Sequence, residues 1–204
     1  MRVLKPASAN VKLGSGANVI TRGPFRGMRL FTLTLQERAT CDKACPQRAH
    51  CYGDNMPFAL RYNPGADLAA ALHADCETLA RKYPNGFAVR LHVLGDFYSV
   101  AYARAWASLL ASFPMLHVYG YTHRRPEDPI GAAVDAVRKA YPKRFSILQS
   151  DGPLGASIPS ALVTTTGQAI PGTVLCPQQT GKTASCLTCG LCMNGRTSVT
   201  FLAH

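Results

Sequence analysis

Hydrophobic and polar positions alternate along this chain between a period of two and a period of about 3.6 residues. Short apolar runs predict strands at 28–35, 87–94, 116–121 and 144–148. Between them, apolar residues recur at helical spacing over 64–82, 99–113 and 129–141, with Asn63 as a possible cap of the first helix. Four strands alternating with three helices favour a parallel sheet joined by right-handed crossovers. We therefore expect an α/β fold, either a partial or a small β/α barrel.

The flanks of this pattern are less regular. Residues 1–27 are rich in glycine, proline and basic side chains and predict a basic arm or an irregular cap. After the β/α core at 28–150, a cysteine-rich C-terminal segment at 151–204 offers short strands at 161–165, 172–175 and 198–202. No internal repeat or linker interrupts the 204 residues, so a single domain is expected.

Positive charge is concentrated near the amino terminus. The formal net charge is +11, and the first forty residues carry one acidic residue, Glu37. Their basic residues are Arg2, Lys5, Lys12, Arg22, Arg26, Arg29 and Arg38. Such a segment predicts nucleic acid or another polyanion as a partner, although a solvated surface explains it equally well.

No stretch of the sequence predicts export or membrane insertion. The first ten residues lack the apolar core of a signal peptide, and no run approaches the roughly 18 apolar residues of a membrane span. We expect a cytoplasmic protein with no membrane partner. In that reducing compartment, clustered cysteines are expected as metal ligands or redox groups in preference to disulfides.

Seven of the eight cysteines form two groups that are far apart in the sequence. The first group is Cys41, Cys45 and Cys51, and the second is Cys176, Cys186, Cys189 and Cys192. Grouped thiolates hold zinc or iron-sulfur clusters. A closed zinc site needs four ligands, whereas a [4Fe-4S] cluster held by three cysteines keeps one iron open. The remaining Cys76 lies in a predicted helix and is expected to be a small buried hydrophobe.

The second group has a spacing of its own. Cys186, Cys189 and Cys192 follow the C-x2-C-x2-C pattern of bacterial ferredoxins, whose completing cysteine precedes a proline, as Cys176 does here. Gly190 would allow a positive φ angle in that loop. A second iron-sulfur cluster is favoured, and a four-cysteine zinc knuckle is the alternative.

The first group carries a resemblance. The segment T-C-D-K-A-C-P-Q-R-A-H-C-Y after the first core strand resembles the radical S-adenosylmethionine (SAM) superfamily, with five residues before the third cysteine where that superfamily usually has two. The resemblance implies that three cysteines hold a [4Fe-4S] cluster whose fourth iron binds SAM. It also implies that His50 lies near the adenine and that Gly95 and Asp96 bind the amino group.

Two further strand ends would face the same site. His123 closes the third strand, where it could act as a proton donor or a ligand contact, or could hydrogen-bond within its loop. Ser150 and Asp151 close the fourth strand, a place where radical SAM enzymes often contact the ribose or the methionine carboxylate; Asp151-Gly152-Pro153 is also an ordinary turn signal.

Over most of its length the chain also looks like the phage and plasmid gene product 88 family. The resemblance lies in N-V-K-L-G, C-x3-C-x5-C-Y, R-L-H-V-L-G-D-F-Y-S, Y-G-Y-T-H, C-P-Q-Q-T and C-x2-C-G-L-C. It implies a shared fold and cysteine site more than an activity.

Three functions follow from these patterns. The first is a radical SAM-like enzyme with an auxiliary cluster, an electron donor and an unknown substrate. The second is a SAM-independent iron-sulfur protein of redox chemistry or sulfur transfer. The third is a zinc-stabilised nucleic-acid-binding module.

Overall fold

A computed structural model describes residues 1–14, 16–45 and 47–203, and of His50 the backbone without the side chain. Over these ranges one eight-stranded sheet has the order β1-β2-β3-β4-β5-β6-β8-β7. It is parallel except for β1, which pairs antiparallel with β2. The strands are β1 (Lys5–Pro6), β2 (Arg29–Thr32), β3 (Phe87–Leu91), β4 (Leu116–Thr122), β5 (Phe145–Ser150), β6 (Ser160–Thr164), β7 (Val174–Leu175) and β8 (Val199–Leu202).

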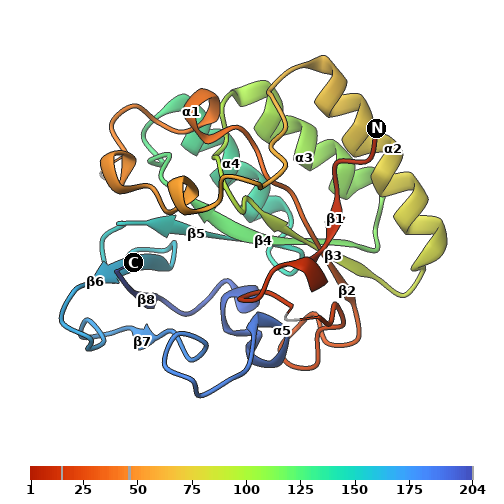
Figure 1. The fold of residues 1–204 in the computed structure, drawn as a ribbon. Coiled ribbons are helices and arrows are strands. Elements are labelled where there is room, and N and C mark those ends of the chain that lie inside the picture. Colours follow the sequence, from red (N-terminus) through yellow and green to blue (C-terminus); the bar gives the residue numbers. More distant parts are fainter. Residues whose placement is uncertain (15, 46, 204) are drawn as a thin grey trace.

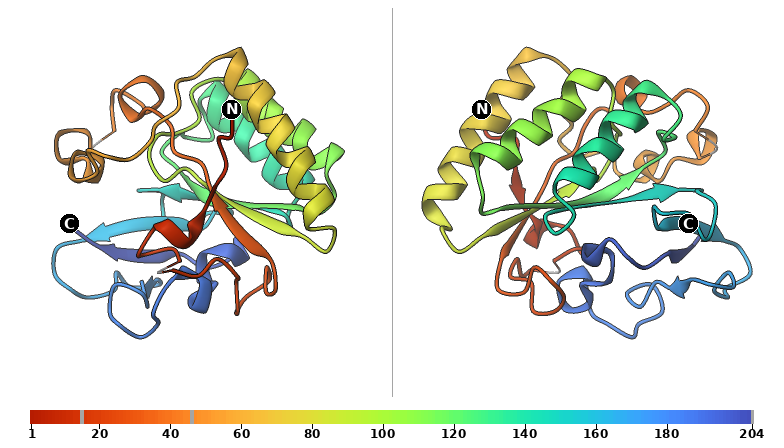
Figure 2. Two further views of the ribbon diagram at one scale, coloured as in Figure 1. Left: turned by 45° about the vertical axis from the view of Figure 1, so that its right-hand side comes forward. Right: turned by 180° about the vertical axis from the view of Figure 1, so that it is seen from behind.

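The three predicted helices connect successive strands and lie on the same face of the sheet (Figures 1 and 2). They are α2 (Ala66–Lys82), α3 (Val100–Ser112) and α4 (Pro129–Ala140). Right-handed crossovers that add each new strand on the same side place every connecting helix on one face. Ser99 and Asp128 cap α3 and α4 with their side chains, whereas the N-cap of α2 is Gly65 and not the predicted Asn63.

The α/β fold with a mostly parallel sheet is confirmed, but a barrel is not. In the described residues the strand order is linear, with β1 and β7 at its two edges. The helix-strand repeat stops at β5, and β6, β7 and β8 are joined by loops and by the cysteine-rich segment. The described residues therefore lack the further helix-strand units that would close the sheet on itself.

Side chains alternate between the two faces of the core strands. Phe87, Val89 and Leu91 of β3 belong to the core beneath the helices, together with the fully buried Trp106 of α3. Ala88 of the same strand belongs to a second core on the opposite face. Cys76 lies in the first core with no exposed surface, as expected of a buried hydrophobe.

The opposite face of the sheet is covered by segments from both ends of the chain (Figure 2). Ile20 and Phe25 of the N-terminal segment are fully buried in the second core, where they meet Leu187 and Met193 of the C-terminal segment. Residues 7–14 and 16–27 thus form a largely irregular cap on this face, and most basic side chains of the N-terminal segment are exposed.

The C-terminal segment contains the three short strands expected there. β6, β7 and β8 lie within one or two residues of their predicted bounds. Short helices complete the described chain: α1 (Glu37–Thr40), α5 (Cys186–Cys189), η1 (Ala7–Ala9), η2 (Arg48–His50), η3 (Tyr52–Asn55) and η4 (Leu191–Asn194). In the part of the chain that is described, no helix is both long and apolar enough to cross a membrane.

Candidate functional site

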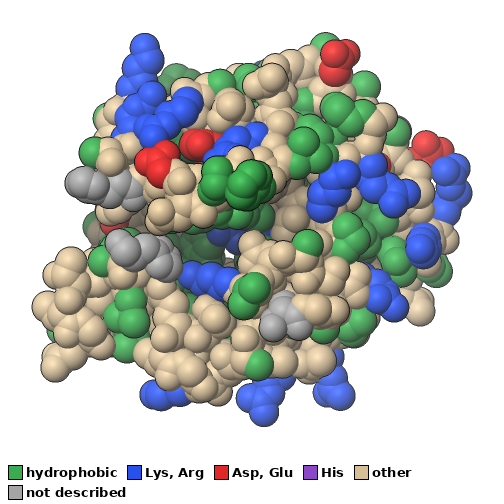
Figure 3. Space-filling model, in the orientation of Figure 1, with side chains coloured by type: hydrophobic (Ala, Val, Ile, Leu, Met, Phe, Trp, Pro, Cys, Tyr) green, Lys and Arg blue, Asp and Glu red, His purple; other side chains and the backbone are tan. Residues whose placement is uncertain are grey.

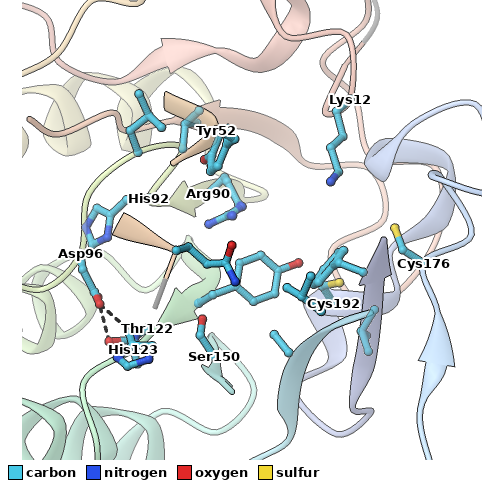
Figure 4. A pocket seen from close by; sticks show the side chains of 18 of the residues that line it. Lys12, Tyr52, Arg90, His92, Asp96, Thr122, His123, Ser150, Cys176 and Cys192 are labelled. Carbon is cyan, nitrogen blue, oxygen red and sulfur yellow. Dashed lines mark hydrogen bonds between the residues drawn. The ribbon is translucent and has the colours of Figure 1, made fainter. Parts of the chain in front are cut away.

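All seven grouped cysteines line a single cavity of about 620 Å³. The cavity lies where the carboxyl ends of the central strands meet the loops of both cysteine groups, and Figure 4 shows its labelled side chains. A hollow between the upper and the lower part of the molecule is visible on the face drawn in Figure 3. Chain folding thus brings together two groups that are separated by more than a hundred residues.

The first group lies in the connection between β2 and α2. Cys41 directly follows the single turn of α1, and its N–H donates to the Glu37 carbonyl at 2.9 Å. Cys51 lies between η2 and η3, and Cys45 lies in the loop before η2. His50, predicted to lie near an adenine, has a side chain outside the described part of the structure.

Two arginines hold this cysteine loop in place. Arg61 forms an ion pair with the buried Glu37 at 2.8 Å and donates to the Gly53 carbonyl. Arg124, which follows β4, donates to the Asp42 carboxylate and to the Thr40 carbonyl, each at 3.0 Å. Planar guanidinium groups suit such multiple contacts, so the loop is fixed by side chains although it has little regular structure.

The second group is built on two short helical turns. Cys186 and Cys189 begin and end α5, and Cys192 follows in η4. Gly190 separates the turns with a left-handed φ of 69°, as its place in the C-x2-C-x2-C segment predicted. Cys176 directly follows β7, and its N–H donates to the Thr200 carbonyl of β8.

The N-terminal cap is hydrogen-bonded directly to the second group. The Cys186 N–H donates to the Lys12 carbonyl at 3.0 Å, and the Thr21 N–H donates to the Leu187 carbonyl at 2.9 Å. A Cβ added to Gly190 would lie 2.5 Å from the Arg22 carbonyl oxygen. Only glycine allows this close approach, so the cap and the second cysteine group form one unit.

Negative charge surrounds the first group. Burial, followed by the negative charge of Asp96 and of neighbouring thiolates, raises the pKa of Cys41 to about 12. Burial also raises the pKa of Cys45, and Asp96 and Asp151 add to this effect. Without a cation these thiols are neutral, so binding of a metal would have to supply the charge that ionises them.

Positive charge lies near the second group. Burial raises the pKa of Cys186 to about 11 and that of Cys192 to about 12. The charge of Arg90 opposes both shifts, and Lys12 opposes that of Cys186.

The thiols are grouped without converging on a single point. Among the described residues, no three His, Cys, Asp or Glu side chains are placed to hold one metal ion. A zinc ion needs its sulfurs about 2.3 Å from one centre. A cubane cluster binds each cysteine through a different iron, so its sulfurs stand further apart. Cys176 is buried, the other six grouped cysteines are half-buried, and all seven are free thiols.

Gly95 and Asp96 follow β3 and line the cavity. Gly95 has a φ of 89°, and a Cβ there would lie 2.6 Å from Leu35 Cβ. The Asp96 carboxylate accepts hydrogen bonds from Thr122 Oγ1 and from the N–H groups of Phe97 and His123. Both residues therefore have structural roles in joining the strand ends.

His123, Ser150 and Asp151 also line the cavity. His123 Nε2 lies 3.9 Å from Asp151 Oδ2, too far for a hydrogen bond. Asp151 has a φ of 51°, the one positive value for a residue other than glycine among those described. Residues other than glycine seldom adopt such a conformation, and those that do are concentrated at functional sites.

The sequence interpretation missed several residues of the cavity, above all Arg90 and Tyr119. Arg90 of β3 pairs in register with Tyr119 of β4, and its guanidinium lies 4.4 Å from the centre of the Tyr121 ring. The alternation of side chains along β3 could have identified Arg90, because it is the charged residue on the face of this strand that turns away from the helices.

Comparisons with known proteins agree with the predicted family. The gene product 88 family model matches residues 8–195. The Gene 88 proteins of Mycobacterium phages D29 and L5 are each 30% identical to the chain, over 157 and 156 residues, and the match covers 67% of this chain. It spans 61% of the length of those relatives. No solved structure matches the chain. The chain belongs to the gene product 88 family.

Proposed function

We propose that this chain is an iron-sulfur protein with two centres at one cavity. Cys41, Cys45 and Cys51 would hold a [4Fe-4S] cluster with one open iron. Cys176, Cys186, Cys189 and Cys192 would hold a closed auxiliary cluster. The observation that carries the proposal is that all seven cysteines line the same cavity, although they come from opposite ends of the chain.

Such a cluster would supply an iron that binds a small molecule and exchanges electrons with it. The chain itself provides an enclosed space and fixed ligands. Arg61 and Arg124 hold the first cysteine loop, while the N-terminal cap holds the second. The free volume between the groups gives a small substrate access to the open iron.

A radical SAM-like reaction is the first form of this proposal. Its support is the order of strand, cysteine loop, helix, strand and Gly-Asp segment around the carboxyl ends of a parallel sheet. Asp96 is the ligand that the resemblance assigns to the SAM amino group. Its two oxygens already accept three protein hydrogen bonds, which leaves room for about one more.

A SAM-independent redox or sulfur-transfer function is the second form, and the three hydrogen bonds that Asp96 already accepts from the protein favour it. The zinc-stabilised nucleic-acid module has less support. Lys12 is half-buried and lines the cavity, and Arg38 pairs with Asp54 at 2.9 Å. The basic side chains visible in Figure 3 occupy several separate places.

The test begins with anaerobic purification and measurement of iron, zinc and acid-labile sulfide. We expect about eight iron and eight sulfide per chain if both centres are [4Fe-4S] clusters. Substituting the first group by serine should remove about half of the iron, and substituting the second group should remove the other half. Cys76→Ala is the matched control because Cys76 lies in the core outside both groups. A colourless protein with two zinc atoms would overturn the proposal.

Addition of SAM separates the two forms. If SAM binds the open iron, the electron paramagnetic resonance signal of the reduced protein should change, and reduction should yield 5′-deoxyadenosine or methionine. An unchanged signal in protein with intact clusters would assign the SAM-independent form.

A further inference from the structure

Arg90 lines the cavity, and no carboxylate pairs with it among the described residues. Arg38, which also lines the cavity, pairs with Asp54. Arg90 instead donates through Nη1 to the Leu91 carbonyl and lies over the rings of Tyr119 and Tyr121. The stacking on the two rings and the hydrogen bond to the Leu91 carbonyl fix the plane of the guanidinium. Its remaining N–H groups have no anionic partner among the described residues.

Two buried polar atoms next to this arginine also lack a partner. Tyr119 is 1% exposed and its hydroxyl makes no hydrogen bond in the structure. His92 is 4% exposed; its Nε2 lies 2.9 Å from the Tyr102 hydroxyl, while its Nδ1 has no partner. Both residues line the cavity. Buried polar atoms are almost always satisfied, so each exception asks for a ligand or water that completes it.

These groups share one location. Arg90 and Tyr119 are paired in register on adjacent strands, and the charge of Arg90 contributes to the lowered pKa of His92 after the effect of burial. In Figure 4 the Arg90 side chain points into the cavity, with His92 on one side of it and Cys192 on the other. The arrangement offers a fixed cation, a hydroxyl donor and an imidazole nitrogen to one ligand.

We propose that Arg90, Tyr119 and His92 form a binding site for the anionic group of a small molecule, a carboxylate or a phosphate, in the cavity between the two cysteine groups. A planar guanidinium matches both anions with two parallel hydrogen bonds. The tyrosine hydroxyl donates a third bond, and His92 contributes Nδ1–H when its other nitrogen accepts from Tyr102. The proposal deepens the proposed function, since it names the class of substrate that reaches the open iron. The anion site itself is built without any cysteine.

The test titrates inorganic phosphate and acetate into the full chain by calorimetry, in metal-free and in reconstituted protein. We expect one of the two anions to bind, and its identity distinguishes a phosphate from a carboxylate substrate. Arg90→Gln should weaken that binding about tenfold or more, because it removes a charge-assisted bidentate contact. Arg29→Gln is the matched control, since Arg29 also lies over a tyrosine ring but outside the cavity.

Tyr119→Phe gives a second readout that does not depend on the charge. It should weaken anion binding by roughly threefold to tenfold, and it should leave the melting temperature equal or higher because the lost hydroxyl has no protein partner. If the Tyr119 hydroxyl served only to stabilise the fold, Tyr119→Phe would lower the melting temperature and leave anion binding unchanged.

The outcomes also separate this site from the iron-sulfur proposal. Arg90→Gln protein that retains its iron and sulfide but loses anion binding supports the site. If the variant loses iron while its anion binding is unchanged, Arg90 serves only to balance the charge of a cluster and the inference is wrong. It is equally wrong if neither anion binds to metal-free or to reconstituted protein. Loss of iron in the cysteine variants tests the clusters alone.

Discussion

Thr122 donates a hydrogen bond of 2.7 Å to Asp96, and this contact joins the ends of two neighbouring parallel strands at the cavity. Burial raises the pKa of Asp96, while the hydrogen bond from Thr122 is the largest of the effects that oppose this shift. The N–H of His123, the next residue, donates to the other carboxylate oxygen at 2.9 Å. The carboxylate thereby fixes the position of His123 relative to β3.

Removing the Thr122 hydroxyl should therefore destabilise the fold. Thr122→Val preserves the shape of the side chain but leaves a buried carboxylate short of one donor, which we expect to cost about 1 to 3 kcal/mol. Chemical denaturation measures this loss. Thr78→Val is the control, because the Thr78 hydroxyl bonds to a carbonyl at the exposed surface of α2. Equal stability of the two variants would contradict a structural role for the Thr122 contact.

The β/α core was predictable from the sequence because its strands and helices have a strong hydrophobic period. α3 and α4 begin at Val100 and Pro129, within a residue of the predicted starts. The open, linear order of the sheet was not predictable, since it depends on residues 151–198, where the pattern is weak. Short helices such as α1 and α5 were missed because a single turn shows no period.

The candidate site was predicted in part. Cysteine spacing indicated two groups but carried no information on their distance in space, because only the folded chain brings both groups to one cavity. Asp96 was interpreted as a ligand from its position, and two of the three donors around it, Thr122 and His123, are residues that only the folded chain brings near. Arg90 was overlooked because a lone arginine in a strand has no motif.

Acid should destabilise the protein through His92. Burial, followed by the charge of Arg90, lowers the pKa of His92 to about 3 from its ordinary value near 6.5. Between these values the unfolded chain binds a proton that the folded chain does not. The free energy of unfolding should therefore fall as the pH is lowered from about 6.5 towards 3, by at most about 1.4 kcal/mol per pH unit.

Denaturation of metal-free protein across this pH range measures the effect. His92→Gln should flatten the dependence, whereas His73→Gln, which changes an exposed histidine on α2, should preserve it. A slope that is the same in both variants would show that His92 does not titrate with unfolding.

Gly190 should be essential for docking of the N-terminal cap. Gly190→Ala introduces a Cβ at a left-handed φ of 69°, and this Cβ would lie 2.5 Å from the Arg22 carbonyl oxygen. Gly181→Ala is a matched control: its φ is 73°, but nothing lies within 4 Å of the added Cβ. Both variants carry a strain of roughly 1 to 2 kcal/mol, and only the first adds a clash with backbone.

Limited proteolysis distinguishes these variants. We expect cleavage within residues 1–27 to become faster in Gly190→Ala than in Gly181→Ala, because the cap detaches from the second cysteine group. If both variants are cleaved at the same rate, the close approach contributes nothing beyond the left-handed conformation.

The ion pair between Arg61 and Glu37 should control loading of the first cysteine group. Their side chains are 16% and 9% exposed, and Arg61 also donates to the carbonyls of Gly53, Met56 and Ala59. Arg61→Gln leaves a buried carboxylate without its cation, which we expect to cost about 3 to 5 kcal/mol. Arg81→Gln breaks an exposed pair with Glu77, where the side chains are 70% and 53% exposed, and should cost less than about 1 kcal/mol.

Under the proposed function, Arg61→Gln should lose about half of the bound iron because the loop of Cys41, Cys45 and Cys51 loosens, while the second group stays loaded. Iron and sulfide analysis of the two purified variants decides the matter: full iron in Arg61→Gln would mean that the first group binds its cluster without this support.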